Sequence, residues 1–243
     1  EQYLRRFQNK LSVGSGSFGI VLKASDVLMQ TPVALKEIHR PDESDEQDSD
    51  WYKDILNEVR SASIIKHDNV VQPKEIIPVG NNLVSIVMAY YPDTLRSFLK
   101  SLRDNKSEIS MGIFVTLMEG ILSGVGMAHH YSIIHRDIKP GNILLTDSQI
   151  PVIADFGLAR GFGPVDNSPM TKDTGTSDYM APEQWAGKQG DGRTDIFSIG
   201  VVMYEILNGE VTTQQQIAGE NADKKQHSAF VYDPSRYIEP RLA

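Results

Sequence analysis

Residues 135–142, with the sequence His-Arg-Asp-Ile-Lys-Pro-Gly-Asn, bring an imidazole, a guanidinium, a carboxylate, an ammonium and an amide into one short stretch. Asp137 can accept a proton from an incoming hydroxyl, and Lys139 can neutralise a phosphoryl group during its transfer. Asn142 offers a neutral oxygen to a divalent metal ion. A solvated loop can hold such charges by chance, but this order of side chains fits phosphoryl-transfer chemistry.

The same stretch matches H-R-D-x-x-x-x-N, the catalytic-loop pattern of protein kinases, with Ile138 where leucine is usual. On these residues the chain resembles a eukaryotic-type protein kinase. Lys139 is typical of the serine/threonine branch, because tyrosine kinases usually carry Ala or Arg there. The resemblance implies that Asp137 and Lys139 are catalytic.

A glycine-rich segment near the N-terminus, residues 14–21, fits G-x-G-x-x-G-x-V. A G-x-G-x-x-G motif alone is weak evidence, but a dinucleotide-binding motif should lead into a helix. Residues 20–24 predict a strand instead, so we expect a hairpin whose glycines let the backbone approach phosphates; a plain flexible hairpin is the alternative. The resemblance implies an ATP contact by Val13, Gly14, Ser15, Gly16, Ser17, Phe18, Gly19 and Val21.

Residues 33–36, Val-Ala-Leu-Lys, resemble the V-A-I-K strand of kinases. Alternation puts Val33 and Leu35 on one face of a strand and Ala34 and Lys36 on the other. The resemblance implies that Lys36 contacts the α- and β-phosphates and that Ala34 leaves room for adenine. The alternative is that Lys36 is an ordinary edge or surface lysine.

Apolar residues at helical spacing predict a helix over residues 51–65. By resemblance, Glu58 on this helix pairs with Lys36; Glu58 could instead be an exposed charge, and Asp54 is a competitor. The preceding acidic run, residues 42–50, predicts an exposed loop.

A buried strand is predicted over residues 83–88, followed by Ala-Tyr-Tyr-Pro. The resemblance implies an N-lobe over residues 1–88, a hinge at 89–92 and a C-lobe over 93–243. Met88 would be the gatekeeper, and the backbone of Ala89 and Tyr91 would bind adenine.

A D-F-G sequence, residues 155–157, follows the predicted strand 152–154 and lies eighteen residues after Asp137. At this position the resemblance implies that Asp155 chelates Mg²⁺, with Asn142 as the second protein ligand. Phe156 would pack beneath the helix at 51–65.

The composition of residues 160–176 predicts a mobile loop, and residues 175–183 resemble the end of a kinase activation segment. Thr176 would hydrogen-bond Asp137 and Lys139. Arg136 would bind a phosphothreonine of this loop, with Thr171 favoured over Thr174. The alternative is that both are ordinary loop threonines.

Two further helices are expected in the C-lobe, over residues 113–130 and 196–207. The buried side of the first is predicted to include Leu122 together with Ile121, Val125 and Ala128. By resemblance, Asp195 opens the second helix and braces the backbone of the catalytic loop. After Gly209 the resemblance weakens, so the C-lobe is expected to be atypical or shortened there.

Composition narrows the class of protein. The chain has 243 residues, 40% hydrophobic, no cysteine and a net charge of −8, which leaves enough apolar residues for a core and argues against nucleic-acid binding. No apolar stretch approaches the roughly 18 residues of a membrane span. We expect an intracellular protein, cytoplasmic or nuclear.

Together these motifs predict an α+β bilobal fold, with a five-stranded antiparallel sheet and one helix in the N-lobe and a mainly helical C-lobe. The expected activity is ATP- and Mg²⁺-dependent transfer of phosphate to serine or threonine of a protein substrate. An upstream activating kinase is a further expected partner. The alternative is a pseudokinase or scaffold that binds nucleotide and partners without efficient catalysis.

Overall fold

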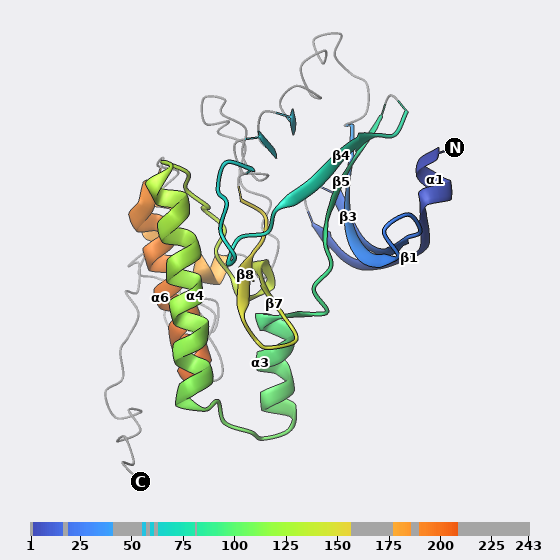
Figure 1. Ribbon diagram of the computed structural model, residues 1–243. Helices are drawn as coiled ribbons and strands as arrows, with labels where there is room; N and C mark the ends of the chain where they lie inside the picture. The colour runs from blue at the N-terminus through green and yellow to red at the C-terminus, as the bar shows by residue number, and fades with distance from the viewer. Residues whose placement is uncertain are drawn as a thin grey trace, which may run out of the picture.

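The computed structural model describes residues 2–16, 19–40, 55–56, 59–60, 63–80, 82–156, 177–185 and 190–208. These residues form a small lobe built on a β-sheet and a larger lobe dominated by helices, connected through the segment that follows β5 (Figure 1). The predicted α+β bilobal fold is therefore confirmed.

The small lobe contains a five-stranded antiparallel sheet in the order β1-β2-β3-β5-β4. Its strands are β1 (Phe7–Gly16), β2 (Gly19–Asp26), β3 (Thr31–His39), β4 (Pro73–Pro78) and β5 (Leu83–Ala89). A short helix, α1 (Gln2–Arg6), precedes the sheet and was not anticipated. Figure 1 shows α1 beside the β1 side of the sheet.

Gly19 opens β2 with a φ of 137°, a conformation that side-chain-bearing residues rarely adopt. A Cβ at this position would collide with the carbonyl oxygen of Glu37 on β3. Glycine is thus required here because the hairpin turns directly against the strand that carries Lys36.

The two faces of β3 serve different purposes, as the alternation predicted. Val33 and Leu35 pack with Tyr3 and Phe7 in one apolar cluster. Lys36 points away from that cluster and reaches Asp155 of the larger lobe. One strand therefore joins the core of the small lobe to the space between the lobes.

The larger lobe combines helices with a small sheet, whose order is β6-β7-β8. Its elements are β6 (Asp93–Thr94), α3 (Leu95–Asp104), α4 (Met111–His130), the 3₁₀ turn η2 (Pro140–Asn142), β7 (Ile143–Leu145), β8 (Pro151–Ile153), the 3₁₀ turn η3 (Ser177–Tyr179), α5 (Pro182–Trp185) and α6 (Gly192–Asn208). A capping box of Thr94 and Ser97 begins α3.

Helices α4 and α6 pack side by side in the larger lobe (Figure 1). Ile121, Val125 and Ala128 of α4 are buried in its core, but Leu122 is 48% exposed, so its predicted burial was wrong. Successive helical residues are turned by about 100°, which takes Leu122 off the stripe formed by its neighbours.

Helix α4 is also long and apolar enough, by length and composition alone, to cross a membrane. The sequence alone predicts no membrane span here. In the structure α4 packs against β8 and α6, which is the position of a core helix.

Candidate active site

The backbone of residues 135–136 is held by one buried carboxylate. Asp195, near the start of α6, is fully buried and accepts hydrogen bonds from the backbone N–H of His135 at 2.9 Å and of Arg136 at 2.7 Å. His129 Nε2 lies 2.7 Å from the same carboxylate. The prediction that Asp195 braces this loop is confirmed, whereas the part played by His129 was not anticipated.

The His135 ring is buried. Its Nε2 lies 2.7 Å from the carbonyl oxygen of Ala154, and its Nδ1 accepts from the backbone N–H of Asp137 at 3.2 Å. This pattern fits a neutral ring with the proton on Nε2. The ring meets Phe156 edge-on, with centroids 4.7 Å apart. His135 therefore links Asp137 to the segment that carries Asp155.

The side chains of Lys139 and Asn142 both contact the carboxylate of Asp137. Lys139 Nζ lies 2.8 Å from Asp137 Oδ2, and Asn142 Nδ2 donates to the same oxygen at 2.9 Å. Asn142 Nδ2 also donates to the Asp137 carbonyl oxygen at 2.8 Å. Both side chains therefore orient the Asp137 carboxylate.

Asp155 lies across from Lys36, whose Nζ donates to Asp155 Oδ1 at 2.7 Å. Burial works to raise the pKa of the Asp155 carboxyl, but the ammonium of Lys36, assisted by that of Lys139, outweighs it and holds that pKa below its usual value. Asp155 is therefore ionised at neutral pH. It adopts a φ of 63°, an uncommon conformation for a non-glycine residue that is often found at functional sites.

Asn142 and Asp155 are brought together by the backbone. The N–H of Ala154 donates to the Asn142 carbonyl oxygen at 2.9 Å, which sets the residue before Asp155 against the loop. Because Asn142 Nδ2 is engaged with Asp137, its Oδ1 remains as an acceptor. Few, hard oxygen donors suit a divalent metal ion that takes its other ligands from phosphate and water. No cluster of three or more His, Cys, Asp or Glu residues suited to a metal occurs among the described residues.

The residues predicted to surround adenine flank the junction between the lobes. Ala34 is buried and pairs in register with Met88, while Val33 pairs with Ala89. Tyr91 is half-buried and packs against the apolar cluster of Val71, Val152 and Ala154. Val13 and Gly14 are exposed on β1, and Val21 pairs with Gly14 on β2.

A comparison with known families gives the same assignment over nearly the whole chain. A family model described as the protein kinase domain matches residues 7–239. The chain belongs to the protein kinase family. The residues that the kinase motifs single out are brought together here by β3, the loop at 135–142 and the end of β8; they are Lys36, Asp137, Lys139, Asn142 and Asp155.

Individual relatives indicate which branch of the protein kinase family the chain resembles. A probable serine/threonine-protein kinase of Clostridium acetobutylicum is 32% identical over 206 residues, which are 85% of this chain and 30% of that protein. The serine/threonine-protein kinase PknA of Corynebacterium glutamicum is 33% identical over 81% of this chain and 42% of its own length. Human cyclin-dependent kinase 10 is 34% identical over 84% of this chain and 55% of its own length. The chain therefore spans about a third to a half of the length of these relatives.

The end of the kinase activation segment is anchored to the catalytic loop and to α6. Gln184 donates from Nε2 to the Arg136 carbonyl oxygen at 2.9 Å, and its Oε1 accepts from the backbone of Ala181. The buried Tyr179 hydroxyl donates to Glu205 Oε2 at 2.6 Å. Sequence reasoning missed Gln184 and Glu205, although their positions after A-P-E and near the end of an apolar helix were available signals.

Several predicted residues lie outside the part of the chain that the structure describes. These are Ser17, Phe18, Glu58, Thr171, Thr174 and Thr176, together with the side chain of Ser15 and the residues after 208. The proposed Lys36–Glu58 pair and the contact of Thr176 with Asp137 and Lys139 therefore stay predictions. For Gly16 the structure describes only its place at the end of β1.

Proposed function

We propose that this chain catalyses transfer of the ATP γ-phosphate to serine or threonine side chains of a protein substrate, with Mg²⁺ as the metal. The observation that carries the proposal is the convergence of Lys139 and Asn142 on the Asp137 carboxylate, in a loop whose backbone is held by Asp195. The relatives named as serine/threonine kinases support the enzyme, and nothing in them favours the non-catalytic alternative.

Each side chain has a role that follows from its chemistry. Asp137 orients the acceptor hydroxyl and takes its proton, while Lys139, 2.8 Å away, neutralises charge on the transferring group. Lys36 holds the nucleotide phosphates, and Asn142 and Asp155 hold the metal. When bound, Mg²⁺ neutralises phosphate charge and fixes the phosphate geometry. Because the reaction consumes ATP, we propose an intracellular location, cytoplasmic or nuclear.

The test is a phosphate-transfer assay with radiolabelled ATP and a degenerate library of serine, threonine and tyrosine peptides. We expect label on serine and threonine, loss of transfer on chelation of divalent ions, and recovery with Mg²⁺. The Asp137→Asn variant serves as the control. Absence of transfer by the wild-type protein, or label on tyrosine alone, would overturn the proposal.

Regulation by phosphorylation of the activation loop is the second part of this proposal. Arg136 sits beside Asp137 with a φ of 65°, and its Nε is buried without a hydrogen-bond partner among the described residues. A buried donor without a partner is costly, and a phosphate supplies strong acceptors. We propose that phosphorylated Thr171, with Thr174 as second choice, is that partner and that an upstream kinase adds it.

Phosphorylating the protein, mapping the modified residues by mass spectrometry and comparing turnover with Thr171→Ala and Thr174→Ala tests this regulation. Higher turnover on phosphorylation, lost in Thr171→Ala, is the expected result. A doubly substituted protein as active as the phosphorylated wild type would show that the threonines are ordinary loop residues.

A further inference from the structure

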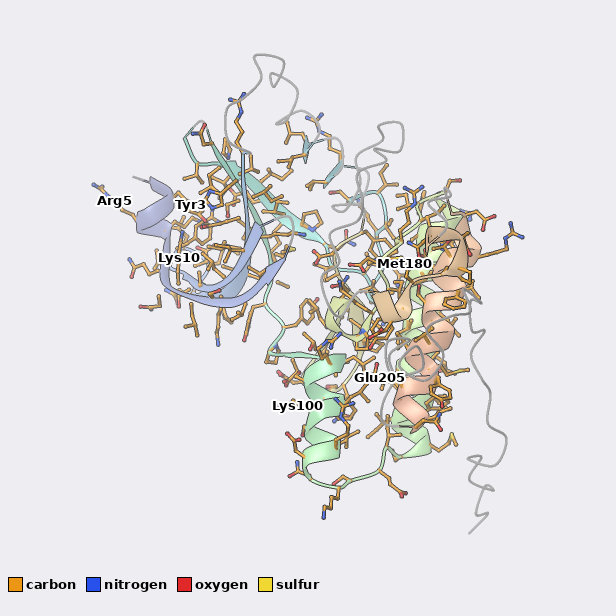
Figure 2. All side chains as sticks on the ribbon, turned by 180° about the vertical axis from the view of Figure 1, so that it is seen from behind. Tyr3, Arg5, Lys10, Lys100, Met180 and Glu205 are labelled. Carbon is orange, nitrogen blue, oxygen red and sulfur yellow. The ribbon has the colours of Figure 1, made fainter. Side chains whose placement is uncertain are left out.

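One face of α3 carries a row of basic side chains that the catalytic mechanism does not use. Arg96, Lys100 and Arg103 are separated by four and three residues, so they lie above one another on the same side of the helix. All three are exposed, whereas Leu95 and Leu99 are buried beneath them. We call these three residues the α3 basic row; Figure 2 labels Lys100 within it.

The first member of the row lies over the catalytic loop. Arg96 Nε is 3.6 Å from the position that a Cβ on Gly141 would occupy, and Gly141 stands between Lys139 and Asn142. The charge of Arg96 also lowers the pKa of Asp178 and of Tyr179, although burial outweighs it and both pKa values are raised overall. Arg96 therefore stands between the loop that carries Asp137 and the end of the activation segment.

The last member of the row, Arg103, pairs with the nearby carboxylate of Glu205. Arg103 Nη1 lies 3.6 Å from Glu205 Oε1, while Glu205 Oε2 accepts from the Tyr179 hydroxyl. Both oxygens of Glu205 are thus engaged inside the protein, and Glu205 is 8% exposed. A cationic substrate residue would have to displace Arg103 to reach this carboxylate.

Arg96 remains available to a ligand. Among the described residues it makes no hydrogen bond and no ion pair within 4 Å, and it is exposed. An exposed guanidinium presents up to five N–H donors in a planar array suited to carboxylate or phosphate. Arg96 therefore places positive charge close to the loop that carries Asp137, although the whole chain has a net charge of −8.

We infer that the α3 basic row selects substrates with an anionic side chain, Asp, Glu or a phosphorylated residue, close to the phosphorylated serine or threonine. Arg96 makes the contact, and Lys100 adds positive charge. The inference rests on the proposed kinase activity and adds the substrate class to it.

The test measures kcat/KM for serine peptides in which alanine, aspartate, phosphoserine or arginine is fixed in turn at each position around the acceptor. We expect the wild-type protein to favour aspartate and phosphoserine over alanine at one or two positions by about fivefold, the upper range for an exposed ion pair. Arg96→Glu should reverse the preference toward arginine at those same positions, and Arg96→Gln should abolish it. Lys74→Glu, an exposed charge change of the same kind on β4, should leave the preference unaltered.

Three results would be decisive. A peptide preference that changes with the charge at residue 96 supports the inference. The ratio of kcat/KM for the phosphoserine peptides to that for the aspartate peptides then shows which of the two anionic residues is preferred. Transfer to all peptides without anionic preference, or an unchanged preference in both Arg96 variants, overturns this inference and leaves the proposed function standing. Absence of transfer to every peptide by the wild-type protein overturns the proposed function.

Discussion

The two sides of the active site are held in place by different means. On the transfer side, the loop of residues 135–136 is fastened by backbone hydrogen bonds to the fully buried Asp195. On the nucleotide side, Lys36 reaches the other lobe through one ion pair with Asp155, whose side chain is 38% exposed. Buried, hydrogen-bonded groups set a geometry firmly, whereas a partly exposed ion pair is weakened by solvent.

The difference matches what each side has to do. The proton acceptor must be oriented before the substrate arrives, because preorganisation supplies much of the catalytic gain in phosphoryl transfer. Lys36 and Asp155 must instead admit phosphates and a metal, so an interaction that can be exchanged is suited to them. The predictions below test this contrast, in order of decreasing effect.

Substitution of the proton acceptor should have the largest effect. We expect Asp137→Asn to reduce kcat by about 10²–10⁴-fold, the usual contribution of general base catalysis, with ATP affinity nearly unchanged. Single-turnover kinetics and a nucleotide-binding titration measure the two quantities. Near wild-type turnover in the purified variant would remove Asp137 from this role.

Loss of the brace on the transfer side should come next. Asp195→Asn leaves an amide that cannot accept from both His135 and Arg136 while also facing His129, so we expect a loss of about 3 kcal/mol in the free energy of unfolding. We also expect a fall in kcat without a matching rise in KM for ATP. Urea unfolding and steady-state kinetics check both. A stable variant with unchanged kcat would show that the loop does not depend on Asp195.

The nucleotide side should show a smaller coupling. A double-mutant cycle with Lys36→Met and Asp155→Asn should give an interaction free energy of about 1–2 kcal/mol in unfolding. Because the pKa of Asp155 is lowered in the folded protein, this contribution is present above the ordinary carboxyl pKa of about 3.9 and is lost as pH falls through the folded value. Additive effects at neutral pH would argue that the pair contributes nothing.

The smallest effect on stability and activity should come from substituting Tyr3, which packs on the face of β3 opposite Lys36. Tyr3 donates its hydroxyl proton within a cluster that joins Glu37 at 2.6 Å and Ser85 at 2.9 Å, and these two residues are register partners on β3 and β5. Tyr3→Phe should therefore cost about 1 kcal/mol of unfolding free energy and raise KM for ATP slightly. The exposed Tyr131→Phe is the matched control. Equal effects of the two substitutions would show that the hydrogen bonds of the Tyr3 hydroxyl do not stabilise the protein.

Much of this contrast could be predicted from sequence where a motif fixes both residue type and spacing. The H-R-D-x-x-x-x-N stretch predicted which residues would gather, and the alternation of residues 33–36 predicted the two faces of β3. The helix at 113–130 was expected close to its observed limits, Met111–His130.

What could not be predicted were contacts between distant segments. Nothing in the sequence joins His129 to Asp195, or Tyr3 to Glu37 and Ser85, because those pairs arise only when the helices and strands pack. The exposure of Leu122 was misjudged for a related reason: in a nearly all-apolar helix, hydrophobicity does not show which side faces the core.

Helix α4 also affects how the domain can be shortened. Its buried residues share a core with Ile199, Val202 and Ile206 of α6, which follow it in the chain by some seventy residues. A ribosome thus releases an apolar helix well before the helix that covers it, and such surface favours aggregation. Recombinant versions that stop short of residue 208 should therefore be recovered largely as insoluble protein, whereas those that retain α6 should not.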